Sequence, residues 1–363
     1  MLQADSPIPP GDGDLAFQAK SLEAVSRTFA LTIPQLPAAL GQVIGNAYLL
    51  CRIADTIEDD SGLSARQKRE FSNRFIALLN GHGDAAAFAA ELHPLLTSAT
   101  LPAEHELVHR TERVLRITRS FTPTQQAHLE RCVRIMSQGM VEFQNRSDHS
   151  GLPDLAAFDR YCYRVAGVVG EMLTEVFCEY SPEIARHHNQ LGALAISFGA
   201  ALQMTNILKD VWEDQQRGAC WLPRDLFSAH GCDLHQLNRE RSNPAFQAGM
   251  QKMISLAHGH LRNSMSYLLL IPAHESGIRR FCLWALGMAV LTLRKINNNL
   301  HFTSGQRVKI SRDAVRWTIA LSNRFSENDA MLRALFWLST RGLPAATMPT
   351  PESMSACRGE PAV

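Results

Sequence analysis

The sequence predicts an all-α protein organised as one large helical domain. Apolar residues recur at the spacing of a helix face along almost the whole chain, with neither β-type alternation nor an Asn-Gly hairpin signal. The 363 residues are 45% hydrophobic and 20% charged, a composition typical of a globular protein with a large core. No stretch rich in Gly, Ser or Pro marks an internal boundary, and Gly151 and Pro153 only separate two long helices.

The two ends of the chain are expected to lie outside this domain. Residues 1–14 lack the basic and apolar regions of a signal peptide and are predicted to be a disordered lead-in. Residues 341–363, with their Pro, Ser and Ala, are predicted to be a flexible tail, which leaves 15–340 for the domain. Within it, Pro and Ser residues mark predicted helix starts at Pro37, Ser64, Pro102, Pro123, Pro153, Pro182 and Ser311.

Composition excludes several classes of function. A net charge of +1 leaves no broad basic surface for nucleic acid, so an anionic ligand must be held locally. The eight cysteines form no CxxC or zinc-like pattern, which indicates reduced thiols and a cytoplasmic protein. The apolar run at 281–293 is shorter than the roughly 20 residues that span a bilayer, so a buried core helix is predicted there instead of a transmembrane helix.

Two acidic motifs of the same form are the strongest functional signal. DTIED at 55–59 and DVWED at 210–214 each place acids at i, i+3 and i+4, on one helix face. Such like charges repel each other, and a single copy would be interpreted as a solvated surface. Two copies of the motif, each inside an otherwise apolar helix, favour a functional role over a solvated surface.

Each motif continues a polar stripe along its helix. One stripe contains Tyr48, Arg52, Asp55 and Asp59, and the other contains Gln203, Asn206, Asp210 and Asp214. Because the remaining residues of both helices are too apolar for a surface helix, we expect the stripes to line an internal cavity.

Buried carboxylates need a compensating charge, and a divalent cation supplies one. Carboxylate oxygens suit Mg²⁺, which often completes its shell with water and substrate phosphate oxygens. Two facing stripes would then hold a diphosphate through bridging Mg²⁺ ions, with Arg52 adding bidentate hydrogen bonds. Alternatives stay open: Arg52 can instead form an ion pair with Asp55, and Gln203 and Asn206 can be structural amides.

At these motifs the chain resembles the squalene/phytoene synthase family, the head-to-head trans-isoprenyl diphosphate synthases. The resemblance covers about residues 20 to 315, and four blocks carry it: SRTFA at 26–30, YLLCRIADTIEDD at 48–60, YCYRVAGVVGEM at 161–172, and QMTNILKDVWEDQQRGACWLP at 203–223. It implies a helical bundle of the isoprenoid synthase type with a central apolar cavity that keeps water from carbocations.

Within the family, EDQQ at 213–216 and VKISR at 308–312 are similar to the bacterial squalene synthase branch. That branch implies Mg²⁺-dependent condensation of two farnesyl diphosphates to presqualene diphosphate, followed by reduction to squalene with NADPH. The alternative is a dehydrosqualene, phytoene or hydroxysqualene synthase without the reductive step. A non-catalytic helical protein that binds divalent cations is a third, weaker hypothesis, because it leaves Arg27, Arg52 and Tyr161 unexplained.

The resemblance also implies residue roles. The implied metal ligands are Asp55, Glu58, Asp59, Asp210, Glu213 and Asp214. The implied substrate-binding residues are Ser26, Arg27, Phe29, Arg52, Gln203, Asn206 and Lys209. The implied catalytic residues are Tyr161, Tyr48 and Arg52, and Lys309, Arg312 and Asn206 are assigned to NADPH. Two of these residues have plain structural alternatives: Tyr161 as a core aromatic, and VKISR as the start of a helix with Ser311 as its N-cap.

The sequence departs from the family pattern at two positions. Lys209 stands where much of the family has Arg, which replaces a bidentate phosphate contact by a point charge. Ala219 stands where many relatives carry Arg, and Arg217 is the nearby candidate to replace it. Because squalene is insoluble in water, we also expect transient contact with a membrane surface without a spanning anchor.

Overall fold

The structure is a computed structural model that describes residues 11–26, 28–144, 150–239 and 243–358. It confirms the all-α prediction: the described residues form helices, and their one β-type feature is an isolated parallel bridge between Leu152 and Pro223. Contact density divides the chain into two compact units, 1–142 with 175–180, and 143–174 with 181–363. Each unit is described separately below.

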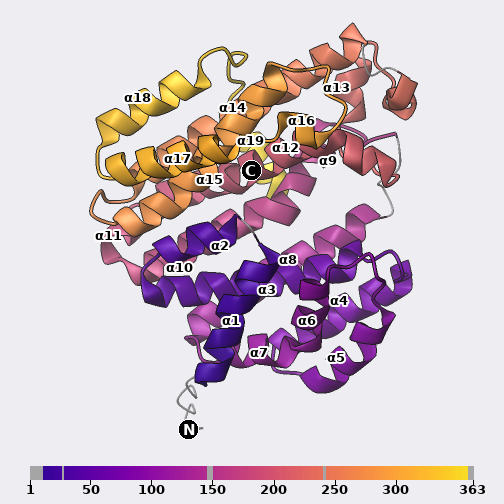
Figure 1. The fold of residues 1–363 in the computed structure, drawn as a ribbon, viewed down its shortest axis with the longest axis vertical. Coiled ribbons are helices and arrows are strands. Elements are labelled where there is room, and N and C mark those ends of the chain that lie inside the picture. The colour runs from indigo at the N-terminus through magenta and orange to yellow at the C-terminus, as the bar shows by residue number, and fades with distance from the viewer. Residues whose placement is uncertain (1–10, 27, 145–149, 240–242, 359–363) are drawn as a thin grey trace. The chain divides into compact units, whose positions relative to one another are not determined.

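Unit 1 is built around α3 (Ala38–Asp59), which packs against α1, α4, α6 and α7 (Figure 1). Leu49, Leu50, Ile53 and Ile57 of α3 are fully buried. The other elements of this unit are α1 (Asp12–Val25), α2 (Phe29–Thr32), η1 (Ile33–Gln35), α4 (Ala65–Leu79), α5 (Ala85–Leu92), η2 (His93–Leu95), α6 (Pro102–His109), α7 (Thr111–Arg119) and most of α8 (Pro123–Gln144).

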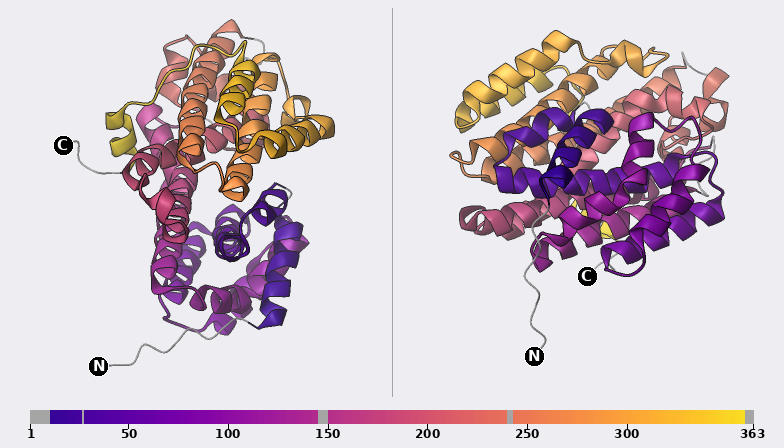
Figure 2. Two further views of the ribbon diagram at one scale, coloured as in Figure 1. Left: turned by 90° about the vertical axis from the view of Figure 1, so that its left-hand side faces the viewer. Right: turned by 60° about the horizontal axis from the view of Figure 1, so that its bottom comes forward.

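Unit 2 is built around α12 (His188–Gln216), which packs against α14 (Pro244–Leu270) and α15 (Ser276–Asn297). α14 and α15 lie beside α17 (Arg312–Phe325) and α18 (Asp329–Thr340) in Figure 1 and in the turned views of Figure 2. The other elements are α9 (Leu155–Cys162), the π-helix η3 (Tyr163–Gly167), α10 (Val168–Tyr180, whose last six residues belong to unit 1), α11 (Pro182–Ala185), α13 (Arg224–Ser228), η4 (Leu234–Arg239), α16 (Gly305–Val308) and α19 (Pro351–Arg358).

The predicted helix starts agree with the structure. Ser64 caps α4 in a capping box with Gln67, and Ser311 caps α17 through a hydrogen bond from Ala314 N–H to its hydroxyl. Pro102, Pro123 and Pro182 are the first residues of α6, α8 and α11, and Pro37 is the N-cap of α3. The start expected at Pro153 falls two residues later, because Asp154 caps α9 by accepting from Ala157 N–H.

Described residues near both chain ends, within the lead-in and the tail defined above, make contacts with the helices. α1 begins at Asp12, where Asp14 pairs with Arg116 at 2.9 Å. At the other end, Thr347 N–H donates to Ser255 O at 3.0 Å, and Arg358 Nε lies 2.8 Å from a Glu171 carboxylate oxygen. Residues 1–10 and 359–363 lie outside the described part of the chain.

The apolar run at 281–293 lies in α15 and is largely buried. α12 and α15 are long and apolar enough to pass a test for membrane spans, but 67% of each apolar window is buried inside the protein. Core helices of globular domains show the same burial, so these two helices are weak evidence for a membrane span.

Candidate active site

The stripe on α3 is held together by Arg52. Its guanidinium donates to the Tyr48 hydroxyl at 2.8 Å and lies 3.9 Å from the Asp55 carboxylate and 3.6 Å from Glu104. The ion pair with Asp55 that the spacing allowed is therefore present. The Arg52 Nε, however, is buried without a hydrogen-bond partner, so the guanidinium retains a donor for a further acceptor.

The segment before α3 packs on the same stripe. The Phe29 and Tyr48 ring centroids lie 5.0 Å apart, and the Tyr48 hydroxyl donates to Val25 O at 3.4 Å. Ser26 Oγ accepts from Phe29 N–H at 3.0 Å and fixes the turn into α2. Ser26 and Phe29 thus lie near Tyr48, whereas Arg27 falls outside the described residues.

Burial, with a smaller effect of neighbouring charges, makes the Asp55 carboxyl a weaker acid than usual. Burial raises the pKa of the Asp55 carboxyl to about 7; Arg52 opposes this rise, and the charges of Asp59 and Glu104 add to it. For Arg52, burial disfavours the charge, but Asp55, Tyr48 and Glu104 outweigh it and raise its pKa. Binding of a proton or a cation would therefore stabilise the buried Asp55 carboxylate.

Glu104 was not predicted as a site residue. It lies on α6, at the third helical position, and its Oε2 also accepts from Leu101 N–H at 3.3 Å. Its distance from Arg52 in the sequence left no local signal for the contact. The acidic run around Asp59 contains one more acid, Asp60, which is buried and accepts from Thr97, Thr100 and Gly62. Asp60 therefore anchors a loop.

The other two acids of the first motif differ in exposure. Glu58 is half-buried, and its backbone carbonyl accepts a hydrogen bond from Lys68 Nζ, while Asp59 is exposed at the end of α3. Their role as metal ligands stays a prediction.

The stripe on α12 gathers around Lys209. Its Nζ lies 3.1 Å from an Asp210 carboxylate oxygen and 3.5 Å from the Asn206 side-chain oxygen. Gln203 is half-buried and Asn206 is exposed on the same helix. Lys209 is thus available as the point charge that the sequence predicted in place of Arg.

Asp210 and Glu213 converge on Gly305. Glu213 Oε1 accepts from Gly305 N–H at 2.8 Å, and the second oxygen of Glu213 is buried without a hydrogen-bond partner. A Cβ at Gly305 would lie 2.9 Å from Asp210 Oδ1, which is closer than real Cβ atoms approach, and 3.0 Å from Lys209 O, which is a tight contact. Glycine at 305 therefore lets α16 approach the acidic motif.

The donor chemistry of both stripes fits a hard divalent cation. Carboxylate oxygens predominate, and one of them, Glu213 Oε2, is an unsatisfied buried acceptor. Within the described ranges, no group of three or more His, Cys, Asp or Glu side chains is already arranged around one point. An ion held here would need substrate or water oxygens to complete its shell.

Asp214 contributes at the end of α12 through its backbone. Its carbonyl accepts from Arg217 and Ala219 N–H at 3.0 Å each, which closes the helix. Arg217 is exposed just beyond this cap, two residues before Ala219.

Tyr161 lies in an aromatic cluster. Its ring stacks on Trp221 at a centroid distance of 4.3 Å and an interplanar angle of 3°, and it meets Phe143 edge-on at 5.2 Å. Trp221 belongs to one of the four family blocks but had not been singled out as a site residue. The outer face of such a stack is electron-rich and can stabilise a positive charge.

A backbone clamp brings Trp221 to Tyr161. Leu152 N–H donates to Leu222 O at 2.9 Å, and Arg224 N–H donates to Leu152 O at 2.8 Å. Gly151 precedes this pair with φ of 80°, and a Cβ there would lie 2.5 Å from Leu222 O. The glycine between the two long helices therefore has a positional role.

The segment expected to hold NADPH links α16 to α17. Ser311 caps α17, as the structural alternative expected, and the assignment of the segment to NADPH stays a prediction. Lys309 accepts a hydrogen bond at its carbonyl from Lys295 Nζ at 2.6 Å, and the side chains of Arg307, Lys309 and Arg312 are exposed. Three exposed cations in six residues suit phosphate groups by charge and donor type.

Comparison with protein families identifies a match over most of the chain. The squalene/phytoene synthase family model covers residues 22–314. A squalene synthase of Botryococcus braunii is 29% identical over 342 residues, with 89% of this chain and 68% of the relative covered. A squalene synthase of Candida albicans is 28% identical over 312 residues, with 81% and 65% covered. The chain thus spans about two thirds of the length of these relatives.

Solved structures share the fold. The structure of TcSQS with the ligand BPH1237 superposes with a TM-score of 0.71 at 24% identity, over 96% of this chain and all of that one. A dehydrosqualene synthase with a bound ligand gives a TM-score of 0.63 at 20% identity, over 86% of this chain and 96% of that one. At these identities the likeness concerns the fold alone.

Proposed function

The chain belongs to the squalene/phytoene synthase family, and from that premise we propose that it condenses two farnesyl diphosphates to presqualene diphosphate and reduces this to squalene with NADPH. The curated relatives reported above are squalene synthases, and the similarity covers more than four fifths of the chain. The product is the finer part of the proposal, because the same fold serves a dehydrosqualene synthase.

The observation that carries the proposal is the chemistry of the two acidic stripes. Asp55 has a pKa near 7 among crowded carboxylates, and the buried Glu213 Oε2 has no hydrogen-bond partner. Each feature favours a cation at its own stripe. A diphosphate can complete the shell of a carboxylate-bound Mg²⁺. Magnesium would neutralise the charge that develops on the departing diphosphate.

Within each stripe the protein's own side chains bind and orient the substrate. Arg52 has a free buried Nε–H for a phosphate oxygen, and Lys209 adds a second positive charge beside Asp210. The outer face of the Tyr161–Trp221 stack stabilises an allylic cation, and the Tyr161 hydroxyl relays the proton lost on cyclopropane closure.

The reductive step is assigned to the segment between α16 and α17. Arg307, Lys309 and Arg312 are exposed cations that suit the phosphates of NADPH, and Glu213 docks the start of α16 beside the acidic motif through Gly305. Asn206 is the further contact proposed from α12. The competing function, a dehydrosqualene, phytoene or hydroxysqualene synthase, gains support from the structural use of this segment as a helix start.

Product analysis separates the two functions. Purified protein with farnesyl diphosphate and Mg²⁺ is incubated with and without NADPH, and products are measured by gas chromatography after dephosphorylation. We expect squalene only with NADPH, and presqualene alcohol and dehydrosqualene without it. An identical product profile in both reactions would contradict the reductive function.

Lys309→Ala tests the assignment of the segment itself. Removing the cation should slow the reductive step more than the condensation, by roughly tenfold for one charge-assisted contact. The matched control is Lys20→Ala, which removes an exposed lysine from α1. Equal slowing of both half-reactions by Lys309→Ala would remove this residue from the cofactor site.

A further inference from the structure

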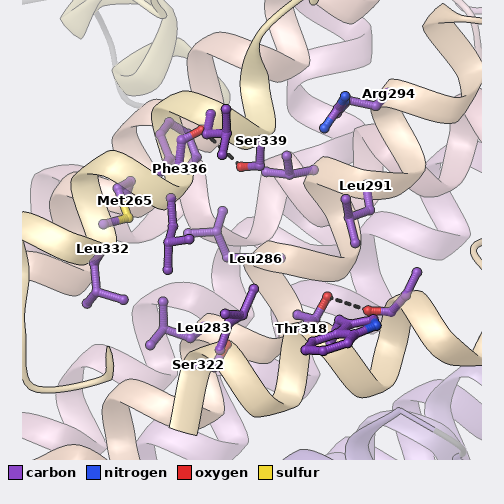
Figure 3. Close-up of a pocket in the computed structure, with 17 residues that line it drawn as sticks. Met265, Leu283, Leu286, Leu291, Arg294, Thr318, Ser322, Leu332, Phe336 and Ser339 are labelled. Atoms are coloured by element: carbon purple, nitrogen blue, oxygen red, sulfur yellow. Dashed lines mark hydrogen bonds between the residues drawn. The ribbon is translucent and has the colours of Figure 1, made fainter. Parts of the chain in front are cut away.

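An apolar pocket lies between α15, α17 and α18, in a part of unit 2 to which no catalytic role is assigned. It encloses about 370 Å³, and Figure 3 shows Leu283, Leu286, Leu291, Leu332 and Phe336 around it. Arg294 is the single charged residue among its lining side chains. A pocket of this size accommodates part of an acyl chain but little polar chemistry.

The rim of this pocket exposes large apolar side chains. Trp317 on α17 is 68% exposed and Leu338 on α18 is 54% exposed, and both line the pocket. Trp337, next to Leu338, is 63% exposed, and the Arg341 guanidinium lies 4.9 Å from its ring centroid. Soluble surfaces rarely gather such side chains without a partner. Tryptophan with arginine is the combination typical of a membrane interface.

The same segment carries an excess of positive charge. Beyond the three cations assigned above to NADPH, residues 313–341 contain four Arg and three Asp or Glu. Two of these acids are paired, Asp329 at 2.6 Å with the buried Arg279 and Asp313 at 3.2 Å with Arg316. The exposed Arg324 and Arg333, together with Arg341, are then opposed by Glu327.

We propose that α17 and α18 form a docking surface for an anionic lipid bilayer, with Trp317, Trp337 and Leu338 at the level of the headgroups. The charge selects this occupant: a neutral apolar partner would gain nothing from the surplus of arginines, whereas anionic lipid attracts each one near its surface. α17 and α18 have 14 and 12 residues, which suits helices lying in the interface and not crossing the bilayer.

The biological purpose of the surface rests on the proposed function, since a water-insoluble C30 product must leave for a membrane. The binding itself does not rest on it. A vesicle assay therefore tests the surface even if the enzyme makes a different product, and an activity assay tests the function even if no vesicle is bound.

The test is co-flotation of the full chain with two kinds of vesicle, phosphatidylcholine alone and phosphatidylcholine mixed with phosphatidylglycerol. We expect flotation with the anionic vesicles and at least a tenfold weaker partition to the neutral ones, from about 1 kcal/mol per arginine near the surface. Tryptophan emission should be quenched by brominated lipid in the bound sample. Flotation independent of lipid charge, or none, would overturn the proposal.

Two variants locate the contact. Trp317→Ser with Trp337→Ser should reduce anionic partition by roughly tenfold or more, and Arg324→Glu with Arg333→Glu should do the same. The controls are Leu101→Ser, which removes a 57% exposed apolar side chain in unit 1, and Arg66→Glu with Arg69→Glu on α4. All variants should retain helical circular dichroism and condensation in detergent. An equal loss of vesicle binding in the control variants would contradict the assignment. Sedimentation showing that the rim mediates self-association in place of lipid binding would contradict it too.

Discussion

At the scale of single residues, Asp55 on α3 and Asp60, the residue that follows the end of this helix, have opposite electrostatic roles. Burial raises the pKa of Asp55 to about 7, above the usual value for an unfolded aspartate, so its charge opposes folding. Burial would also raise the pKa of Asp60, but hydrogen bonds from Thr100, Thr97 and Gly62 outweigh it and lower that pKa. The Asp55 carboxylate would therefore gain from a bound cation, whereas Asp60 stabilises a loop through its hydrogen bonds.

This contrast predicts opposite stability effects in protein stripped of divalent ions. For Asp55, stability is lost as pH rises from about 4 to about 7, so Asp55→Asn should be more stable than the parent at pH about 8, by about 2 kcal/mol. For Asp60, stability is present above its unfolded pKa and lost as pH falls, so Asp60→Asn should be destabilised at neutral pH by at least about 1 kcal/mol.

Thermal unfolding of both variants across this pH range, followed by circular dichroism, measures the two effects. Added Mg²⁺ should stabilise the parent at alkaline pH more than it stabilises Asp55→Asn, which keeps the other acids of the two stripes. A parent protein whose stability increases between pH about 4 and about 7 relative to Asp55→Asn would contradict the assigned environment.

Tyr161 supports a second prediction at this scale. Tyr161→Phe keeps the stack on Trp221 and removes only the hydroxyl, so a loss of rate reports on proton handling. We expect condensation to slow by roughly a hundredfold with little change in the melting temperature. The control is Tyr163→Phe, because the Tyr163 hydroxyl donates to Glu171 at 3.1 Å and should affect stability more than rate. Unchanged turnover in Tyr161→Phe would show that the Tyr161 hydroxyl has no catalytic role and that the residue serves in packing.

At the scale of elements, α16 is tied to α12 through Gly305. A methyl group at this position would come within 2.9 Å of Asp210 Oδ1, so Gly305→Ala must displace either the helix or the carboxylate. We expect a higher Mg²⁺ concentration for half-maximal condensation and a destabilisation of about 1–3 kcal/mol. Gly13→Ala is the control, since its Cβ would meet no atom within 4 Å. A Gly305→Ala enzyme with normal Mg²⁺ dependence would separate α16 from the metal site.

At the scale of the whole molecule, local signals predicted the helices but not their long-range contacts. Prolines and serines marked helix starts because capping depends on neighbouring residues. The contact of Tyr161 with Trp221 and that of Arg52 with Glu104 were not predicted, because the residues of each pair lie more than 50 positions apart in the sequence. The hydrogen bond between Thr347 and Ser255 was not predicted for the same reason, and the residues around Thr347 have the composition of a tail.

The central claim is that the acidic stripes bind the magnesium diphosphate of the substrate. Its most direct test is the rate of presqualene diphosphate formation by Asp55→Asn and Asp210→Asn, measured from radiolabelled farnesyl diphosphate, with the exposed Glu23→Gln on α1 as the control. We predict a loss of roughly a thousandfold in each stripe variant, with the fold intact by circular dichroism and the control unaffected. Near-normal formation of presqualene diphosphate in either folded variant would contradict the claim.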